Sequence, residues 1–303
     1  MLTKVIMMYT AASRLCTRCG KNGHNCKTCT GPITSFGLIV FRQDDKDIGK
    51  MYTEFRDYKC DKQKHNLCRD KKVYNIYKSK CTKLNDTQTR VMLIERKDTI
   101  AFITLIQGVY PDHEPSRSKK ILGYVEELTC EERYKLVNFT WNQLWEIAGT
   151  TRRNKDHSEQ AFKLIDISTI IDQTSCNYID ADYIIPKGRL KCNESIVDCA
   201  VREFSEESGY NTFDVHVLLH IPPFEEEFIG VNGNKYKNVY FTAELKSSAN
   251  IRIPLHEIRE QVKEVKNLGW FTMEESMGII RDCHFLKKKV LWNSYQIITG
   301  KKE

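Results

Sequence analysis

The chain has 303 residues, of which 41% are hydrophobic and 29% are charged. This length and composition predict one large domain or two with a sizeable core and exclude a wholly disordered chain; no apolar run reaches 18 residues, which excludes a transmembrane helix. The net charge of +7 is uneven, because six basic residues and no acidic one precede Asp44, so we expect either a polyanionic partner such as nucleic acid or an ordinary solvated surface.

Four potential metal ligands lie close together near the N-terminus: Cys16, Cys19, His24 and Cys29. The spacing C-x2-C-x4-H-x4-C suits zinc, which takes four such ligands in a tetrahedron. Gly20 and Gly23 allow the tight turns that this spacing needs. The pattern resembles a retroviral-type zinc knuckle, a module that binds single-stranded nucleic acid. A second ligand set, in which Cys26 replaces His24, stays open.

The resemblance to a zinc knuckle implies contacts with RNA. No aromatic residue lies between Cys16 and Cys29, so we expect phosphate contacts rather than base stacking from this segment. The candidate RNA-binding residues are the basic side chains Arg14, Arg18, Lys21 and Lys27. A further group could form a second metal site, but its spacing fits no known pattern and we interpret it as scattered structural thiols: Cys60, His65, Cys68 and Cys81.

Apolar and β-branched runs predict strands in the first part of the chain, over residues 33–41, 91–95 and 100–106, with a polar insertion over 42–81. From about residue 119 to 171 the period is helical, and Thr129–Glu132 and Thr140–Gln143 match the capping box. Short strands are expected at 183–185, 215–220, 239–244 and 268–271, with helices before Gly209 and after Met273. We therefore expect four parts: a basic N-terminus with the knuckle (1–32), a first α/β part (33–108), a helical insertion (109–175) and the main α/β part (176–303).

Residues 188–210 carry the strongest chemical signal in the chain. A glycine-containing turn leads into a predicted helix on which Glu203, Glu206 and Glu207 stand at i, i+3 and i+4, so their carboxylates converge on one face. Because such carboxylates repel one another, they are either paired with cations such as Arg202 or bound to a hard divalent ion such as Mg²⁺. A solvated acidic helix face is the alternative interpretation.

The same residues match the Nudix box, G-x5-E-x7-R-E-U-x-E-E-x-G-U, at every fixed position. Phe204 and Tyr210 fill its two bulky apolar positions. The resemblance to this family implies an α/β/α sandwich around a mixed sheet, here with a helical insertion and the N-terminal knuckle. It also implies hydrolysis of a nucleoside diphosphate that is linked to another moiety.

The resemblance further implies a role for each matching residue. Glu203, Glu206 and Glu207 would bind Mg²⁺ or Mn²⁺. Gly188 would let a backbone group reach metal or phosphate. Glu194 and Arg202 would form a supporting ion pair.

Two flanking segments resemble narrower groups of Nudix enzymes. Residues 186–189 read P-K-G-R, like the P-K-G-K/R sequence of decapping enzymes and of diphosphoinositol polyphosphate hydrolases, which would place Lys187 and Arg189 in the substrate-phosphate loop. Residues 264–270 resemble the E-I-x-x-I-x-W segment of eukaryotic decapping enzymes. Glu264 would then act as metal ligand or general base, and Glu257 is the rival for that role.

The order of motifs outside residues 42–81 resembles Nudix hydrolases of large cytoplasmic DNA viruses. This implies cleavage of the 5′ cap of mRNA to 7-methyl-GDP and 5′-monophosphate RNA, with two or more Mg²⁺ or Mn²⁺ ions in catalysis and one structural Zn²⁺. The expected place of action is the host cytoplasm, with packaging in the virion as a further option. The alternatives are a small-molecule pyrophosphohydrolase that acts on diphosphoinositol polyphosphates or nucleotides, and a non-enzymatic RNA-binding protein on a Nudix scaffold.

Overall fold

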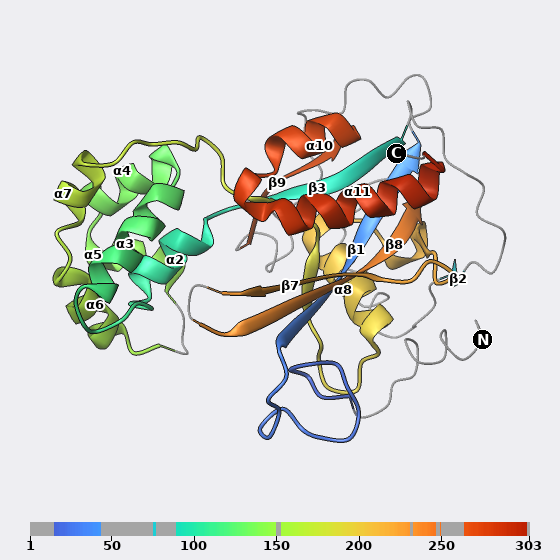
Figure 1. The fold of residues 1–303 in the computed structure, drawn as a ribbon, viewed down its shortest axis with the longest axis horizontal. Coiled ribbons are helices and arrows are strands. Elements are labelled where there is room, and N and C mark those ends of the chain that lie inside the picture. Colours follow the sequence, from blue (N-terminus) through green and yellow to red (C-terminus); the bar gives the residue numbers. More distant parts are fainter. Residues whose placement is uncertain are drawn as a thin grey trace, which may run out of the picture. The chain divides into compact units, whose positions relative to one another are not determined.

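The structure is a computed structural model that describes residues 15–43, 75–76, 89–149, 153–230, 233–246, 249 and 264–301. The chain divides into two compact units, Met1–Ile94 with Tyr183–Glu303 and Glu95–Asp182. In the described residues the first unit is a sheet with helices, and the second is helical apart from the end of one strand (Figure 1). None of the described helices is long and apolar enough to cross a membrane.

A mixed sheet forms the centre of the first unit, in the order β2-β6-β8-β1-β3-β4. These strands are β1 (Ile33–Gln43), β2 (Asn75–Ile76), β3 (Thr89–Arg96), β4 (Tyr183–Ile184), β6 (Val215–Val217) and β8 (Lys235–Leu245). Three more strands pair at the sides, namely β5 (Lys187–Arg189) with β1, β7 (Phe224–Ile229) with β8, and β9 (Val265–Phe271) with β3. The long strands β1 and β8 run parallel, whereas β5 is antiparallel to β1.

Helices cover both faces of this sheet. Successive residues of β1 point to opposite sides, and because β1 is apolar on both of them, each side needs a helix to bury it. Leu38 and Val40 pack with the apolar stripe of α8 (Ile196–Ser208) on one face. Ile39 and Phe41 pack with residues of α11 (Phe285–Thr299) on the other (Figure 1). The remaining short helices of this unit are η3 (Thr212–Asp214), α10 (Met273–Ile279) and η4 (Asp282–His284). The sandwich of helix, sheet and helix that the Nudix resemblance implied is confirmed.

The second unit has its own apolar core, formed between its helices. They are α2 (Ile100–Ile106), α3 (Ser116–Glu127), α4 (Cys130–Asn138), α5 (Trp141–Ala148), α6 (Lys155–Lys163) and α7 (Ile167–Asp172). Both predicted capping boxes are confirmed, at Thr129 before α4 and at Thr140 before α5. A disulfide joins Cys130 to Cys176, a bond that the sequence analysis did not anticipate.

The strand predicted over residues 100–106 is wrong, because this segment is the helix α2. The Thr99 hydroxyl accepts a hydrogen bond from the Phe102 amide at 3.1 Å and caps the helix. A short run that is apolar at nearly every position fits a buried strand and a buried helix equally well, so its periodicity could not decide between them. The strands β5 and β7 were not predicted, since a glycine and three glutamates respectively hide their strand character.

One buried carboxylate connects the N-terminal ends of α2 and α4. Glu132 accepts hydrogen bonds from the Thr99 amide at 2.6 Å, from the Thr99 hydroxyl at 3.0 Å and from the Thr129 amide at 2.9 Å. Burial raises the pKa of Glu132, and these three donors act against that shift. The side chain thus satisfies donors that two helix starts would otherwise leave unpaired.

Replacing Glu132 should therefore destabilise the protein strongly. Glu132→Ala leaves buried backbone donors without an acceptor, and we expect a loss of about 3 kcal/mol in the free energy of unfolding. The matched control is Glu131→Ala in the same turn, whose exposed side chain pairs with Lys135 at 2.7 Å and should contribute about 0.5 kcal/mol or less. Urea unfolding followed by circular dichroism measures both, and equal losses would contradict the role of Glu132.

Candidate active site and cysteine–histidine cluster

The helix α8 carries Glu203, Glu206 and Glu207 and has well-defined ends. The hydroxyl of Ser195 accepts a hydrogen bond from the Asp198 amide at 3.1 Å and caps its start. Gly209 ends it at a φ of 75°, a left-handed conformation that favours glycine. The buried stripe of the helix packs on the sheet, and its glutamates lie next to β5.

The backbone of β5 contacts two of these glutamates. The Lys187 amide donates a hydrogen bond to Glu207 Oε2 at 2.9 Å. At Gly188 the strand passes so close to Glu203 that a methyl group there would overlap the carboxylate. A larger residue at position 188 would have to displace the Glu203 carboxylate, so glycine here lets the strand backbone and this carboxylate lie against each other.

Arg202 binds three carboxylates at once. Its Nε lies 2.7 Å from Glu194 Oε1, and its Nη1 lies 2.6 Å from Glu203 Oε1 and 2.8 Å from Glu206 Oε2. Burial acts to raise the pKa of Glu194, but the hydrogen bonds and charge of Arg202 hold this pKa below its usual value. The structure brings Glu194 and Arg202 together as expected. Its contacts with Glu203 and Glu206 correspond to the cation pairing that the sequence offered as one alternative for these carboxylates.

Glu207 is the most deeply buried of the three glutamates, and Glu264 lies near it. Burial, together with the charges of Glu203 and Glu264, raises the pKa of Glu207 to about 8. Burial also raises the pKa of Glu203. The charged forms of Glu203 and Glu207 are thus both disfavoured at one place, where a divalent cation would stabilise them, and carboxylate oxygens are the ligands that Mg²⁺ and Mn²⁺ prefer. Glu257 lies outside the described residues.

An aromatic contact anchors the strand that follows Glu264. Trp270 of β9 donates from its indole nitrogen to the Tyr210 hydroxyl at 3.2 Å, just beyond the end of α8. The guanidinium of Arg42 lies 4.4 Å from the centroid of the Trp270 ring. In the sequence, Tyr210 and Trp270 are recognisable only as motif positions. The structure indicates that they fix β9 against α8 and β1.

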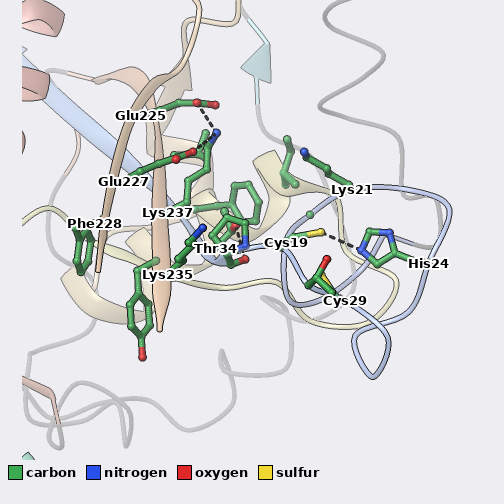
Figure 2. Close-up of a pocket in the computed structure, with 18 of the residues that line it drawn as sticks. Cys19, Lys21, His24, Cys29, Thr34, Glu225, Glu227, Phe228, Lys235 and Lys237 are labelled. Carbon is green, nitrogen blue, oxygen red and sulfur yellow. Dashed lines mark hydrogen bonds and ion pairs between the residues drawn. The ribbon is translucent and has the colours of Figure 1, made fainter. Parts of the chain in front are cut away.

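A pocket of about 770 Å³ lies in the same unit, on another part of the sheet (Figure 2). It is lined by the segment that contains Cys19, His24 and Cys29, by the start of β1, and by the hairpin of β7 and β8. Residue Ile196, at the start of α8, also lines it.

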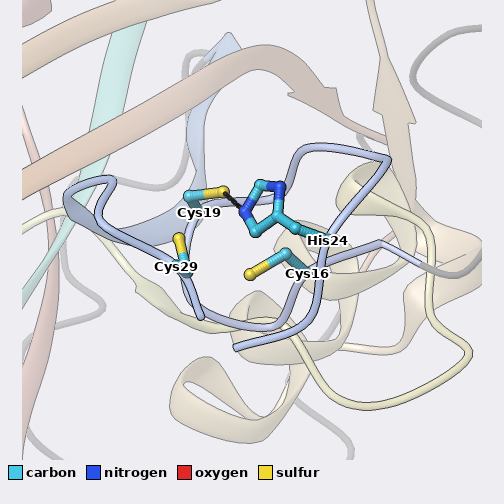
Figure 3. Close-up of side chains that lie close together, drawn as sticks. All are labelled: Cys16, Cys19, His24 and Cys29. Atoms are coloured by element: carbon cyan, nitrogen blue, oxygen red, sulfur yellow. Dashed lines mark hydrogen bonds between the residues drawn. The ribbon is translucent and has the colours of Figure 1, made fainter. Parts of the chain in front are cut away.

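The four predicted zinc ligands converge in this segment (Figure 3). The ligand atoms of Cys16, Cys19, His24 and Cys29 all lie within 4.8 Å of one another. A tetrahedral zinc with bonds of about 2.0–2.3 Å separates its ligand atoms by roughly 3.3–3.8 Å, so the cluster has a suitable size. Gly20 and Gly23 adopt φ values of 72° and 92° at the turns, and Cys26 is exposed. Among the described residues, no other group of three or more His, Cys, Asp or Glu side chains brings its ligand atoms so close together.

The candidate RNA-binding residues differ in exposure and in their contacts. Lys21 and Lys27 are exposed, whereas Arg18 donates from its Nε to the Gly31 carbonyl at 3.0 Å and helps to hold the segment together. Arg14 lies outside the described residues, as do the four members of the second group: Cys60, His65, Cys68 and Cys81.

Comparison with known proteins identifies the family. Residues 169–291 match the family described as NUDIX domain. A putative mRNA-decapping protein of Acanthamoeba polyphaga mimivirus is 28% identical over 345 aligned residues, which cover 94% of each chain. The mRNA-decapping protein g5R of African swine fever virus (isolate Pig/Kenya/KEN-50/1950) is 36% identical over 201 residues, 62% of this chain and 79% of the relative. The chain belongs to the Nudix family. Among solved structures it is similar to an Ap4A hydrolase of C. elegans, at 10% identity over 88% of this chain and 98% of that chain, with a TM-score of 0.39.

The Nudix box therefore occupies β5, the following loop and α8, and it is continuous in space as well as in sequence. Lys187 is half-buried in β5, and Arg189 is exposed at its end. Lys191 is a further basic residue at the acidic face that was not predicted, and its Nζ lies 3.3 Å from Glu206 Oε1. The signal for it was available, because a lysine in the loop between Gly188 and Glu194 can reach back to the acidic face of the helix.

The two possible zinc ligand sets can be separated with one pair of variants. Because the His24 ring nitrogen lies 3.2 Å from Cys19 Sγ while Cys26 is exposed, His24→Ala should lose tightly bound zinc and Cys26→Ser should keep it. Zinc content measured by mass spectrometry of the purified proteins checks this. Loss of zinc from Cys26→Ser with retention in His24→Ala would reverse the assignment.

Proposed function

We propose that this Nudix protein hydrolyses the 5′ cap of mRNA and releases 7-methyl-GDP and 5′-monophosphate RNA. The similarity to the mimivirus relative, which is described as a putative mRNA-decapping protein, carries the choice of substrate because it extends over 94% of both chains. The acidic face of α8 supports the hydrolytic chemistry. Acting on capped RNA, the protein would work in the host cytoplasm.

The proposed metal ligands are Glu203, Glu206, Glu207 and Glu264. Two or more Mg²⁺ or Mn²⁺ ions bound there would supply positive charge to the phosphate bridge and lower the pKa of the attacking water. Arg202 orients Glu203 and Glu206 by its ion pairs at 2.6 and 2.8 Å. Glu194 in turn holds the Arg202 guanidinium at two of its nitrogens.

The proposed phosphate-binding loop is Lys187, Gly188 and Arg189. Gly188 allows the backbone to lie against the acidic face, and the two basic side chains flank it. A polyphosphate bridge carries several negative charges, so the basic residues before and after Gly188 favour its binding. This arrangement positions the phosphates without requiring a base-specific contact at the loop.

We propose Glu264 as the general base. It is exposed, it precedes β9 directly, and its charge contributes to the raised pKa of Glu207. A carboxylate in this position can accept the proton of the attacking water. The contact of Trp270 with Tyr210 holds the strand that follows it. The cysteine–histidine cluster would bind one structural Zn²⁺, and the basic residues around it would hold the RNA.

Product analysis with cap-labelled RNA tests the proposed reaction. In Mg²⁺ or Mn²⁺ the protein should release labelled 7-methyl-GDP, and Glu207→Gln should lower turnover by orders of magnitude. Because burial disfavours the charged form of Glu207, whereas glutamine is neutral and keeps an acceptor for the Lys187 amide, the metal-free melting temperature should hold or rise. Glu131→Gln in the helical unit serves as the control. Release of 7-methyl-GMP, or normal turnover by Glu207→Gln, would refute the proposal.

The role of Glu264 has its own signature. Glu264→Gln should lower turnover by about 10²–10⁴-fold with little change in RNA affinity, and the pH–rate profile should lose its acidic limb. The comparison variant is Glu257→Gln. If that variant removes the acidic limb and Glu264→Gln does not, the base is Glu257.

A further inference from the structure

We propose that the pocket between the Cys16–Cys29 segment and the hairpin of β7 and β8 binds the single-stranded RNA that follows the cap. This inference rests on the proposed function, since it concerns how the same substrate is held. It assigns base stacking to the hairpin and phosphate contacts to both walls of the pocket. The two walls come from parts of the chain about 200 residues apart, and neither makes a complete RNA site by itself.

The wall formed by the cysteine–histidine segment is fixed on the sheet. The Thr34 amide of β1 donates to the Arg18 carbonyl at 2.7 Å. Gly20 lies directly on the Phe36 ring, where a larger residue would collide with the ring. The segment therefore faces the hairpin across a defined pocket, which a flexibly tethered knuckle would not provide.

The pocket combines cations with an apolar floor. Lys21 and Lys235 line it, and neither forms an ion pair within the described part of the chain. Lys237 is paired with two glutamates that also line the pocket, Glu225 and Glu227, the second at 3.2 Å. Three lysines against two glutamates leave a charge of +1, and the two unpaired lysines are available to phosphates. The floor consists of Phe36, Ile196 and Val239.

The hairpin supplies the aromatic surface that the cysteine–histidine segment lacks. Phe228 and Tyr236 are cross-strand partners whose rings stack with centroids 5.6 Å apart and an angle of 16° between planes. Phe228 is 44% exposed, and it lies at the opposite end of the pocket from Cys29, with Lys235 between them (Figure 2). Unpaired bases stack on exposed aromatic rings, and lysines close by along the chain can contact the phosphates of the same strand.

The path between these contacts follows from the strand geometry. Side chains alternate along a strand, so the Phe228–Tyr236 pair and the pair of Lys235 and Lys237 lie on opposite faces of the hairpin. A chain of nucleotides that contacts both must pass over β7, which pairs only with β8 in the described sheet. Single-stranded RNA can make such a bend, whereas a duplex cannot.

The pocket is connected to the catalytic face through shared elements. Phe36 in the pocket floor is the register partner of Gly188 in the Nudix box. Ile196 begins α8, and Glu203 follows seven residues later, about 10 Å along the helix axis. RNA that leaves the catalytic glutamates needs to cover only a short distance to enter the pocket.

The test measures binding separately from cleavage, with a long single-stranded RNA and zinc-loaded protein, in buffer without added Mg²⁺ or Mn²⁺ and without a chelator that would remove the zinc. Lys21→Ala combined with Lys235→Ala should weaken binding and reduce the log–log salt slope by about 1.4, because each lost phosphate contact contributes about 0.7 for a single strand. Phe228→Ala should weaken binding at least about fivefold with an unchanged salt slope, since stacking carries no charge. Lys289→Ala on α11 is the matched control and should change neither quantity.

Hydrolysis assays then separate the RNA chain from the cap. In both pocket variants, the loss of kcat/KM for long capped RNA should exceed the loss for a cap dinucleotide by at least about fivefold. Equal losses for the two substrates would overturn the inference and place the cap itself in the pocket. Unchanged affinity and salt slope in variants that retain zinc would overturn it as well. If the wild-type protein binds RNA through these residues but releases no 7-methyl-GDP, the proposed reaction fails and the RNA site stands.

Discussion

The mutual repulsion of carboxylates on α8 is the constraint on which the rest of the site depends. Glu203, Glu206 and Glu207 share one side of a helix whose opposite side is committed to the sheet. Without compensation, bringing these carboxylates together would destabilise the folded state. Arg202 offsets part of this repulsion, and the backbone amide of Lys187 offsets another part. A divalent cation that binds these oxygens must therefore compete with Arg202, so metal binding and the orientation of Arg202 are coupled.

The same constraint explains why the box is a strand, a loop and a helix rather than a helix alone. The strand β5 brings an amide to Glu207 and has no side chain beside Glu203. The loop returns Glu194 to Arg202. Gly188, Glu194 and Arg202 of the motif thus each meet a requirement of the acidic face, namely space beside Glu203, and a cation with its own partner.

The sequence was sufficient where chemistry and spacing act over a short distance. The Nudix box, the capping boxes at Thr129 and Thr140 and the convergence of the four candidate zinc ligands all involve residues that are close along the chain. It was insufficient for α2, where a run of apolar residues has no period to read. It also could not reveal that Glu132 bridges two helix starts, because the Thr99 that it binds lies 33 residues away. The pocket beside the cysteine–histidine cluster needed the pairing of β1 with β8, which no local pattern encodes.

The disulfide between Cys130 and Cys176 gives the helical unit a dependence on its chemical surroundings. The bond spans 46 residues and encloses the helices from α4 to α7. In the chain-entropy description, closing a loop of this length lowers the conformational entropy of the unfolded state, which stabilises the folded state by about 4 kcal/mol. Cytosolic thiols are kept reduced, so in the cytoplasm these helices must rely on their own packing and on Glu132. In an oxidising medium the disulfide forms, and the free energy of unfolding of this unit rises. The stability of the helical unit therefore depends on the redox conditions around the protein.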